Sequence, residues 1–275
     1  MGTRLGKWFG RIGRRHGVTA TQPDEPLDSL ELPEAAAPPA HRWGFGAFLV
    51  AEAVLVASAA FVSVLLPPVP AGRPTPVSDV LIGTITPTVL AALVAVLITV
   101  WRGNGPRIDL RLEWHWADVR LGLKLGVLGL VLTTVGAFVW THAVGQNNAT
   151  SAIGALVEDQ PMSLTAAIIM FVYLWLLGPV CEEIIYRGLL WGAVERLPWG
   201  GEKWARVAAF LLSTAVFAVS HLEPLRTTLL LVIAVPIGLA RLFTGRLLGA
   251  VVAHQMNNFL PALALLLTTL GVMTL

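Results

Sequence analysis

Seven apolar runs follow one another along the chain after an initial polar segment. They span residues 43–66, 79–101, 121–142, 163–187, 205–223, 226–243 and 247–272. Each run approaches or exceeds the roughly 20 residues with which an α-helix crosses about 30 Å of hydrocarbon. The pattern therefore predicts an all-α, polytopic integral membrane protein with about seven transmembrane helices.

Composition agrees with this fold class. Hydrophobic residues make up 55% of the 275 positions and charged residues only 13%, about half of the ~25% charge of a soluble domain. Several tryptophans lie near the ends of the runs, as in the aromatic belts of membrane interfaces. They are Trp43, Trp101, Trp114, Trp116, Trp140, Trp199 and Trp204. We expect the lipid bilayer as a partner and no nucleic acid.

Residues 1–42 form a polar segment ahead of the first run. The part from residue 19 to residue 39 holds five prolines and five acidic side chains, a composition typical of disordered chain. Between residues 4 and 14, apolar and basic positions fall on separate helical faces, which suits a short helix on an anionic leaflet. A solvated basic tail that acts only as a topology signal fits the same residues. No apolar core of a cleavable signal peptide follows, and we expect a cytoplasmic, largely disordered tail.

Arginine and lysine alternate between the two sides of the predicted bundle. The tail, the loop after the second run and the turns after the fourth and sixth runs are rich in them. The opposite loops carry only Arg73 and Arg226, and residues 143–162 carry none. Because cytoplasmic loops hold the excess of Lys and Arg, we predict a multi-pass cell-membrane protein with its N-terminus in the cytoplasm and its C-terminus outside. Sixteen arginines against three lysines, with heavy use of Ala, Leu and Val, indicate a bacterial source.

Residues 43–142 supply three predicted helices that we interpret as peripheral. Glu52 and Lys124 lie in their apolar runs, each within about ten residues of a predicted membrane boundary, from which a long side chain can reach the interface. We assign neither of them a role in chemistry.

Ionisable residues are concentrated in the fourth apolar run, where Glu182 and Glu183 precede Arg187. An ionisable residue at membrane depth is by default a candidate for function. Glu183 and Arg187 are four apart and share a helical face, so pairing lowers the cost of burying both charges. Glu182 points about 100° away and is the carboxylate that we expect to face a cavity. The Gly178–Pro179 pair bends the helix just before it and frees a backbone carbonyl.

Two further polar pairs recur at helical spacing in later runs. Phe217 and His221 share one face, and so do His254 and Asn258. Helix-rise arithmetic brings the polar groups to one level, about 10 Å below the cytoplasmic surface. We therefore predict one reaction centre that water reaches from the cytoplasm.

At these residues the chain resembles the CPBP family of intramembrane proteases, which includes CAAX proteases and bacteriocin-processing (Abi) proteins. The family signature is Glu-Glu-x-x-x-Arg, then Phe-x-x-x-His, then His-x-x-x-Asn on successive core helices. The order and spacing match here, although Tyr186 stands where phenylalanine is commoner. The resemblance covers about residues 170–262 and implies a CPBP-type catalytic core in residues 160–275.

The resemblance implies hydrolysis of a peptide bond inside the membrane. By analogy with the family, Glu182 and His221 activate the attacking water, His254 and Asn258 stabilise the oxyanion, and Glu183, Arg187 and Phe217 support them. Their chemistry permits these roles, since carboxylates and imidazoles act as general bases and N–H groups bind oxyanions. We expect a membrane-associated peptide or protein as the substrate, CAAX-like or bacteriocin-like.

Two alternatives stay open. Glu182, His221 and His254 could bind a zinc ion together, although we favour a mechanism without a metal or another cofactor.

The single cysteine, Cys181, excludes an internal disulfide. Although Cys181 is next to Glu182, we interpret it as an unreactive residue of the core and not as a nucleophile. The same fold also suits a non-catalytic membrane scaffold or immunity protein in which the polar cluster only fixes helix register. The oligomeric state stays open as well.

Overall fold

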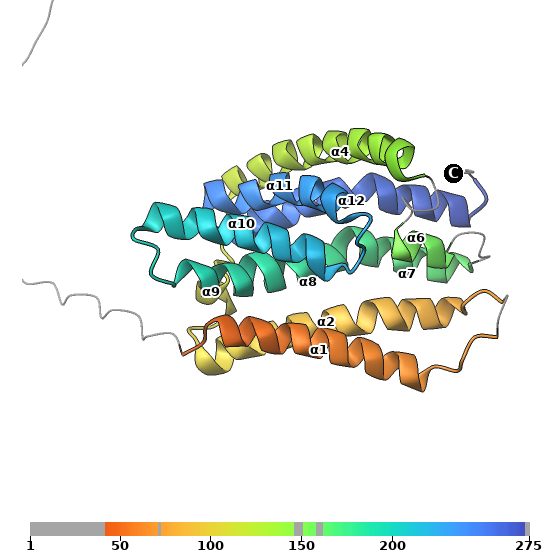
Figure 1. The fold of residues 1–275 in the computed structure, drawn as a ribbon, viewed down its shortest axis with the longest axis horizontal. Coiled ribbons are helices and arrows are strands. Elements are labelled where there is room, and N and C mark those ends of the chain that lie inside the picture. Colours follow the sequence, from red (N-terminus) through yellow and green to blue (C-terminus); the bar gives the residue numbers. More distant parts are fainter. Residues whose placement is uncertain (1–41, 71–72, 146–150, 158–161, 273–275) are drawn as a thin grey trace, which may run out of the picture. The chain divides into compact units, whose positions relative to one another are not determined.

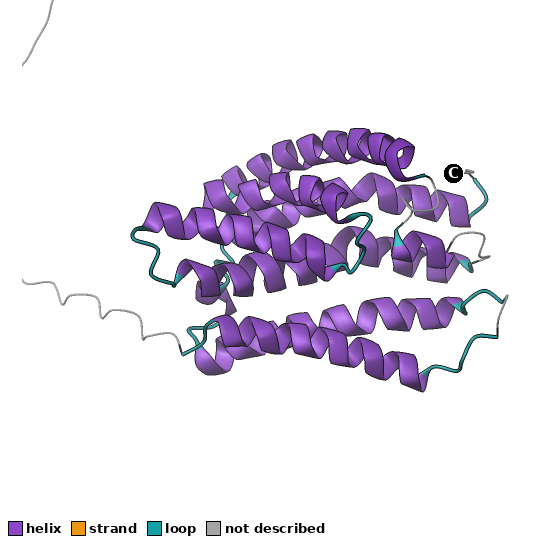
Figure 2. Ribbon diagram, viewed as in Figure 1, coloured by secondary structure: helices purple, strands orange, loops and turns teal. Residues whose placement is uncertain are grey.

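The computed structural model describes residues 42–70, 73–145, 151–157 and 162–272. Within these ranges the regular structure is helical throughout, without a strand (Figure 2). Seven helical stretches are long and apolar enough to cross a membrane. They are α1 (Phe45–Leu65), α2 (Val77–Arg102), α4 (Trp116–Val144), the stretch Leu164–Glu195, α10 (Glu202–Ser220), α11 (Thr227–Thr244) and α12 (Leu247–Thr269). The predicted all-α membrane fold with seven spans is confirmed.

The fourth span is a composite helix. It consists of α7 (Leu164–Val172), the π-helical turn η1 (Tyr173–Leu177), α8 (Gly178–Glu183), the π-helical turn η2 (Ile184–Leu190) and α9 (Trp191–Glu195). It ends at Glu195, well beyond the predicted end at residue 187. Arg187 does not mark a membrane boundary, because its side chain is fully buried and paired. π-helical turns inside α-helices are rare and are frequent at functional sites.

The first two spans form a hairpin that packs against the composite helix, whereas α4 packs along α12 and α11 (Figure 1). Three glycines of α4, Gly122, Gly126 and Gly129, make this approach close. A Cβ on Gly126 would lie 2.5 Å from Met256 Cβ and 2.9 Å from the Ala253 carbonyl oxygen. Small residues at helix interfaces let membrane helices approach closely. Of the three helices in residues 43–142, α4 is therefore built into the C-terminal bundle.

One end of the bundle is rich in arginine. This arginine-rich end comprises the loop of residues 103–115 with the short helix α3 (Pro106–Asp109), the turn of residues 196–201 and the turn of residues 245–246. Trp43 Nε1 donates to Asp109 Oδ2 over 2.6 Å, and Arg246 makes two hydrogen bonds to Asp118, of 2.6 and 2.7 Å. The bonds to Asp118 raise the pKa of the Arg246 guanidinium above its ordinary value.

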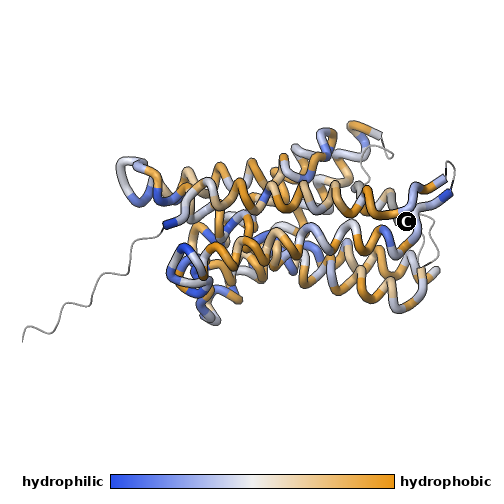
Figure 3. The backbone as a smooth tube through the Cα atoms, turned by 90° about the horizontal axis from the view of Figure 1, so that it is seen from below, coloured by the Kyte–Doolittle hydropathy of each residue, from blue (hydrophilic) through white to orange (hydrophobic). Residues whose placement is uncertain are grey.

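The opposite end comprises residues 66–70 and 73–76, the loop of residues 221–226 and the short helix α6 (Ala152–Val157). In Figure 3, hydrophilic positions concentrate in the loops of the arginine-rich end, and the helices between the two ends are mostly hydrophobic. This distribution is that of a multi-pass membrane protein. The cytoplasmic location of the N-terminus remains a prediction, and the predicted properties of the tail concern residues 1–41, which lie outside the described ranges.

Candidate active site

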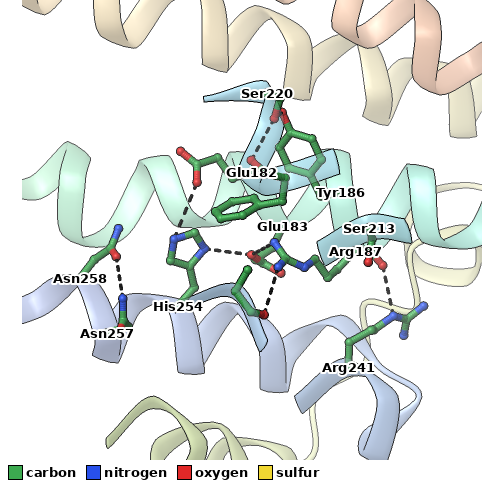
Figure 4. Close-up of polar contacts among 12 residues, drawn as sticks. Glu182, Glu183, Tyr186, Arg187, Ser213, Ser220, Arg241, His254, Asn257 and Asn258 are labelled. Atoms are coloured by element: carbon green, nitrogen blue, oxygen red, sulfur yellow. Dashed lines mark hydrogen bonds and ion pairs between the residues drawn. The ribbon is translucent and has the colours of Figure 1, made fainter. Parts of the chain in front are cut away.

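Three spans bring the predicted site residues together, and Figure 4 shows Glu182, Glu183, Arg187, His254 and Asn258 among them. The composite helix carries Glu182 and Glu183 in α8 and Arg187 in η2. Phe217 lies near the end of α10, and His221 is the residue that ends that helix. His254 and Asn258 lie on one face of α12. The three motifs are far apart in sequence but lie close together in the fold, as the sequence analysis predicted.

Glu183 is the centre of a buried network. Its Oε1 atom accepts a hydrogen bond of 3.0 Å from Arg187 Nη1 and one of 2.8 Å from His254 Nδ1. Arg187 and Glu183 have no exposed side-chain surface, and His254 is only 3% exposed. The predicted Glu183–Arg187 pair is present, and it also holds the histidine of another helix in place. Because a carboxylate oxygen only accepts, His254 carries a proton on Nδ1.

The ring of Phe217 joins this network to the second histidine. Its centroid lies 4.4 Å from the Arg187 guanidinium carbon, a cation–π distance. The centroid is 4.7 Å from the ring of His221 and 5.6 Å from that of His254. Because this buried ring lies between the two imidazoles, it fixes the distance between them. Phe217 therefore supports the geometry of the site.

Glu182 and His221 lie at the accessible edge of the same cluster. The Glu182 side chain is 26% exposed, and its Oε2 atom is 3.7 Å from His254 Nε2. His221 is exposed, and its Nδ1 is 2.7 Å from the Phe217 carbonyl oxygen. Since a carbonyl only accepts, Nδ1 of His221 carries a proton, and Nε2 of the neutral ring is left with a lone pair. No hydrogen bond or ion pair joins Glu182 to His221 within the described ranges, although both line one cavity.

Asn258 is held by a backbone carbonyl that the composite helix leaves free. Its Nδ2 donates to the Leu174 carbonyl oxygen over 3.2 Å. In the π-helical turn the Gly178 amide reaches back five residues to the Tyr173 carbonyl, so the next amide in sequence would reach Leu174. That residue is Pro179, which has no N–H. The prediction that Pro179 frees a carbonyl is confirmed, and the freed group orients the asparagine.

Several residues of the cluster were not predicted from the sequence. Thr133 Oγ1 donates to Asn257 Oδ1 over 2.7 Å, which ties α4 to the site. Ser220 Oγ donates to the Tyr186 hydroxyl over 2.7 Å, and Tyr186 packs edge-on against Phe217. The Gly122-x-x-x-Gly126 pattern is the one signal in the sequence that could have linked α4 to this bundle.

Glu52 also differs from the sequence interpretation. Its Oε1 atom is buried, and the side chain interacts electrostatically with Tyr186 and His221. It therefore points toward the cluster and not toward the membrane interface. Phe48, one turn earlier on α1, makes an edge-on ring contact with Tyr186.

A cavity of about 480 Å³ opens beside Glu182, His221, His254 and Asn258. Its other walls come from Thr133, Ser151, Ile153, Gly154, Leu174, Phe217, Glu223, Arg226, Leu230, Ile233, Asn257, Pro261, Ala262, Ala264 and Leu265. Apart from the site itself, these residues belong to α6, to the loop of residues 221–226 and to the helix halves next to them. The cavity thus reaches the end opposite the arginine-rich one, whereas helix-rise arithmetic had predicted water access from the arginine-rich side. The estimate failed because it counted residues from the turns and could not tell which side was filled by side chains.

The predicted zinc ligands do not form a three-donor cluster. Within the described residues, no three His, Cys, Asp or Glu side chains are grouped as a metal site. His254 Nδ1 is engaged by Glu183 and His221 Nδ1 by a carbonyl oxygen, so Nε2 is the remaining donor atom of each ring, an arrangement that metal-bound histidines also show. Cys181 is a buried free thiol. As placed, Glu182, His221 and His254 are not grouped as a three-ligand zinc site in the described part of the chain, and the mechanism without a metal remains a prediction.

Comparison with known proteins gives one match. Residues 164–260 match the family model described as type II CAAX prenyl endopeptidase Rce1-like. The match covers the composite helix, α10, α11 and most of α12, and it confirms the resemblance to the CPBP family over this part of the chain. Neither the curated proteins nor the solved structures contain a match. The family match and the seven apolar helices support an intramembrane protease at the level of reaction class.

Proposed function

We propose that this protein is an intramembrane endopeptidase in which Glu182 and His221 activate the water that attacks a peptide bond. The observation that carries the proposal is the different placement of two adjacent glutamates. Glu183 is buried and bound to Arg187 and His254, whereas Glu182 is partly exposed at a cavity of about 480 Å³. A buried ion pair alone would suit a scaffold. A second, accessible carboxylate beside two histidines is the arrangement that a hydrolase needs.

His221 and Glu182, the two accessible groups, can each take part in the proton transfer from water. The Nδ1–H of His221 is held by the Phe217 carbonyl oxygen, so Nε2 is the nitrogen that can take a proton from water. The Glu182 carboxylate lies in the same cavity and can orient that water or take its proton directly. His221 ends α10, Glu182 lies in the middle of the composite helix, and both line the cavity through which water enters.

His254 and Asn258 supply the groups for the oxyanion. In its imidazolium form His254 donates from both ring nitrogens, to Glu183 from Nδ1 and toward Glu182 and the cavity from Nε2. Asn258 Nδ2 has two hydrogens, of which one is used by the Leu174 carbonyl. The second one can donate to a tetrahedral intermediate in the cavity. Donors fixed before the reaction stabilise developing charge without reorganisation.

The substrate in this proposal is a membrane-associated peptide or protein, either CAAX-like or bacteriocin-like. A bacterial source makes a prenylated CAAX sequence the less expected of the two. The alternative is a non-catalytic scaffold or immunity protein with the same fold. Such a protein needs the Glu183–Arg187 pair for its structure but has no use for Glu182.

Replacing Glu182 by Gln separates the enzyme from the scaffold. We expect Glu182→Gln to melt in detergent like the wild type and to cleave a reporter peptide at least ~10²-fold more slowly, because general-base catalysis contributes about that much. Glu202→Gln is the matched control, since Glu202 is 78% exposed on the surface of α10, and it should keep the wild-type rate. Full cellular function of folded Glu182→Gln would contradict the protease and leave the scaffold.

Chelation tests the absence of a metal from the mechanism. Purified protein should keep its cleavage rate after exhaustive treatment with a zinc chelator, and elemental analysis should find well under one zinc per chain. Activity that is lost on chelation and returns on addition of Zn²⁺ would instead make Glu182, His221 and His254 candidates for ligands, with movement of their side chains.

A further inference from the structure

Along the bundle axis, the cavity at the site extends from Glu182 in one direction only. From the level of Glu182 its lining residues extend only toward α6 and the loop of residues 221–226. On α11 they lie in the first half of the helix, at Leu230 and Ile233, and on α12 they lie in the second half, at Ala264 and Leu265. Because these two helices run in opposite directions, both sets lie toward the same end of the bundle.

A separate cavity of about 240 Å³ lies at the arginine-rich end, with Trp191, Glu195 and Arg241 among its walls, and neither Glu182 nor His221 lines it. Between the site and the arginine-rich end, buried side chains from the composite helix, α11 and α12 fill the interior. They include Leu189, Leu190, Ile237, Ala240, Leu247 and Ala250, each with no exposed surface. Beneath the cavity, the buried Glu183–Arg187 pair and Phe217 close the floor. A further cavity, of about 140 Å³, reaches Glu182 and His221 from the side of α1 and α2, and it contains no residue of the arginine-rich end. The larger cavity therefore brings water and a peptide to Glu182 and His221 from the end opposite the arginines.

Charge distinguishes the two ends strongly. In the described ranges the loops of the cavity end carry only two Arg or Lys residues, Arg73 and Arg226, and Arg226 is paired with Glu223. The arginine-rich end carries Arg102, Arg107, Arg111, Arg196, Lys203, Arg206 and Arg246. Loops rich in arginine and lysine stay in the cytoplasm during insertion. The cavity mouth then faces away from the cytoplasm.

We infer that the peptide bond is cleaved from the non-cytoplasmic side of the membrane. The inference rests on the proposed protease function. The substrate is a segment of a membrane-attached chain that lies at the outer leaflet, with apolar side chains against Leu230, Ile233 and Leu265 and its scissile carbonyl at Glu182. A translocation reaction must supply this substrate, because a chain that remains in the cytoplasm does not reach the cavity mouth.

Cysteine labelling in intact cells tests the side of access without requiring catalysis. In a Cys181→Ala background, single cysteines are introduced one at a time and treated with a charged, membrane-impermeant methanethiosulfonate. Ser151→Cys and Ala264→Cys report on the cavity. Leu260→Cys is the control on the same helix, because Leu260 is an exposed apolar residue outside the cavity lining. Lys203→Cys reports on the arginine-rich end.

We expect the two cavity cysteines to react fully in intact cells, because a thiol in contact with water ionises and reacts. The lipid-facing cysteine at position 260 should not react, and the cysteine at position 203 should react only after permeabilisation. Labelling of position 264 only after permeabilisation, or at no stage, would overturn the inference. Melting curves verify that each variant folds.

The same cysteine set in a Glu182→Gln background separates the two proposals. An unchanged labelling pattern with no Glu182-dependent cleavage would overturn the protease but keep the accessible cavity. Glu182-dependent cleavage with labelling from the cytoplasm would keep the protease and overturn the side of access.

Discussion

The two faces of the Glu182–Arg187 segment differ in what surrounds them. The buried face holds Glu183 and Arg187 among three helices, with His254 and the ring of Phe217 as further partners. The cavity face holds Glu182, whose Oε2 lies 3.7 Å from His254 Nε2 and whose side chain is partly open to water. Two identical side chains, adjacent in sequence, thus have different energetic roles. Glu183 offsets the charge of Arg187 inside the membrane, whereas Glu182 is the residue that we propose acts on a substrate.

The strongest way to break the buried face is Glu183→Gln. This change leaves Arg187 as an uncompensated charge and replaces the carboxylate oxygen that Arg187 and His254 share by a neutral amide oxygen. Removing one partner of a buried pair typically costs about 3–5 kcal/mol, so the free energy of unfolding should fall by about that amount. Melting in detergent measures it, with Glu182→Gln as the matched control on the cavity face.

The double variant Glu183→Gln plus Arg187→Gln sharpens this result. It removes the charge that the single variant strands, and part of the lost stability should return. A double variant no more stable than the single one would show that Glu183 stabilises the fold through His254 and not through Arg187.

A smaller effect is expected where α4 supports the helix of His254. In Gly126→Ala the new methyl group would lie 2.5 Å from Met256 Cβ, so α4 and α12 must separate. Overpacking of this kind costs about 1–3 kcal/mol, and cleavage should fall as α12 shifts. Gly83→Ala is the control, since a Cβ there meets no atom within 4 Å. Equal melting temperatures for the two variants would contradict the role of the α4 interface.

The smallest effect is expected at the hydrogen bond between α4 and the site. Thr133→Val keeps the shape of the side chain but removes the donor to Asn257 Oδ1. The loss should be about 0.5–1.5 kcal/mol, the net value of one hydrogen bond. Thr134→Val provides the comparison, because Thr134 is exposed and bonds only its own helix at Leu130. A double-mutant cycle with Asn257→Ala tests whether the threonine acts through this asparagine.

The candidate site was more predictable than its surroundings. Polar residues at three- and four-residue spacing in apolar runs mark shared helical faces, which is sufficient to select Glu182, His221, His254 and Asn258. The place of Thr133 beside Asn257 could not be predicted, because a threonine in an apolar helix usually bonds its own backbone. Glu52 was misread for a related reason. A glutamate near the end of an apolar run can extend to the membrane interface or to a neighbouring helix, and the sequence does not distinguish the two cases.

The sequence by itself determined the all-α class, the seven spans and the identity of the polar cluster, because hydrophobic length and helical periodicity are local properties. It also determined that Glu183 pairs with Arg187, since both lie on one turn of one helix. Only the tertiary structure decided that Glu183 also binds His254, that α4 belongs to the C-terminal bundle, and that the cavity opens away from the arginine-rich end. These features depend on which side chains of distant helices fill the same space, and packing between helices has no counterpart in a local pattern.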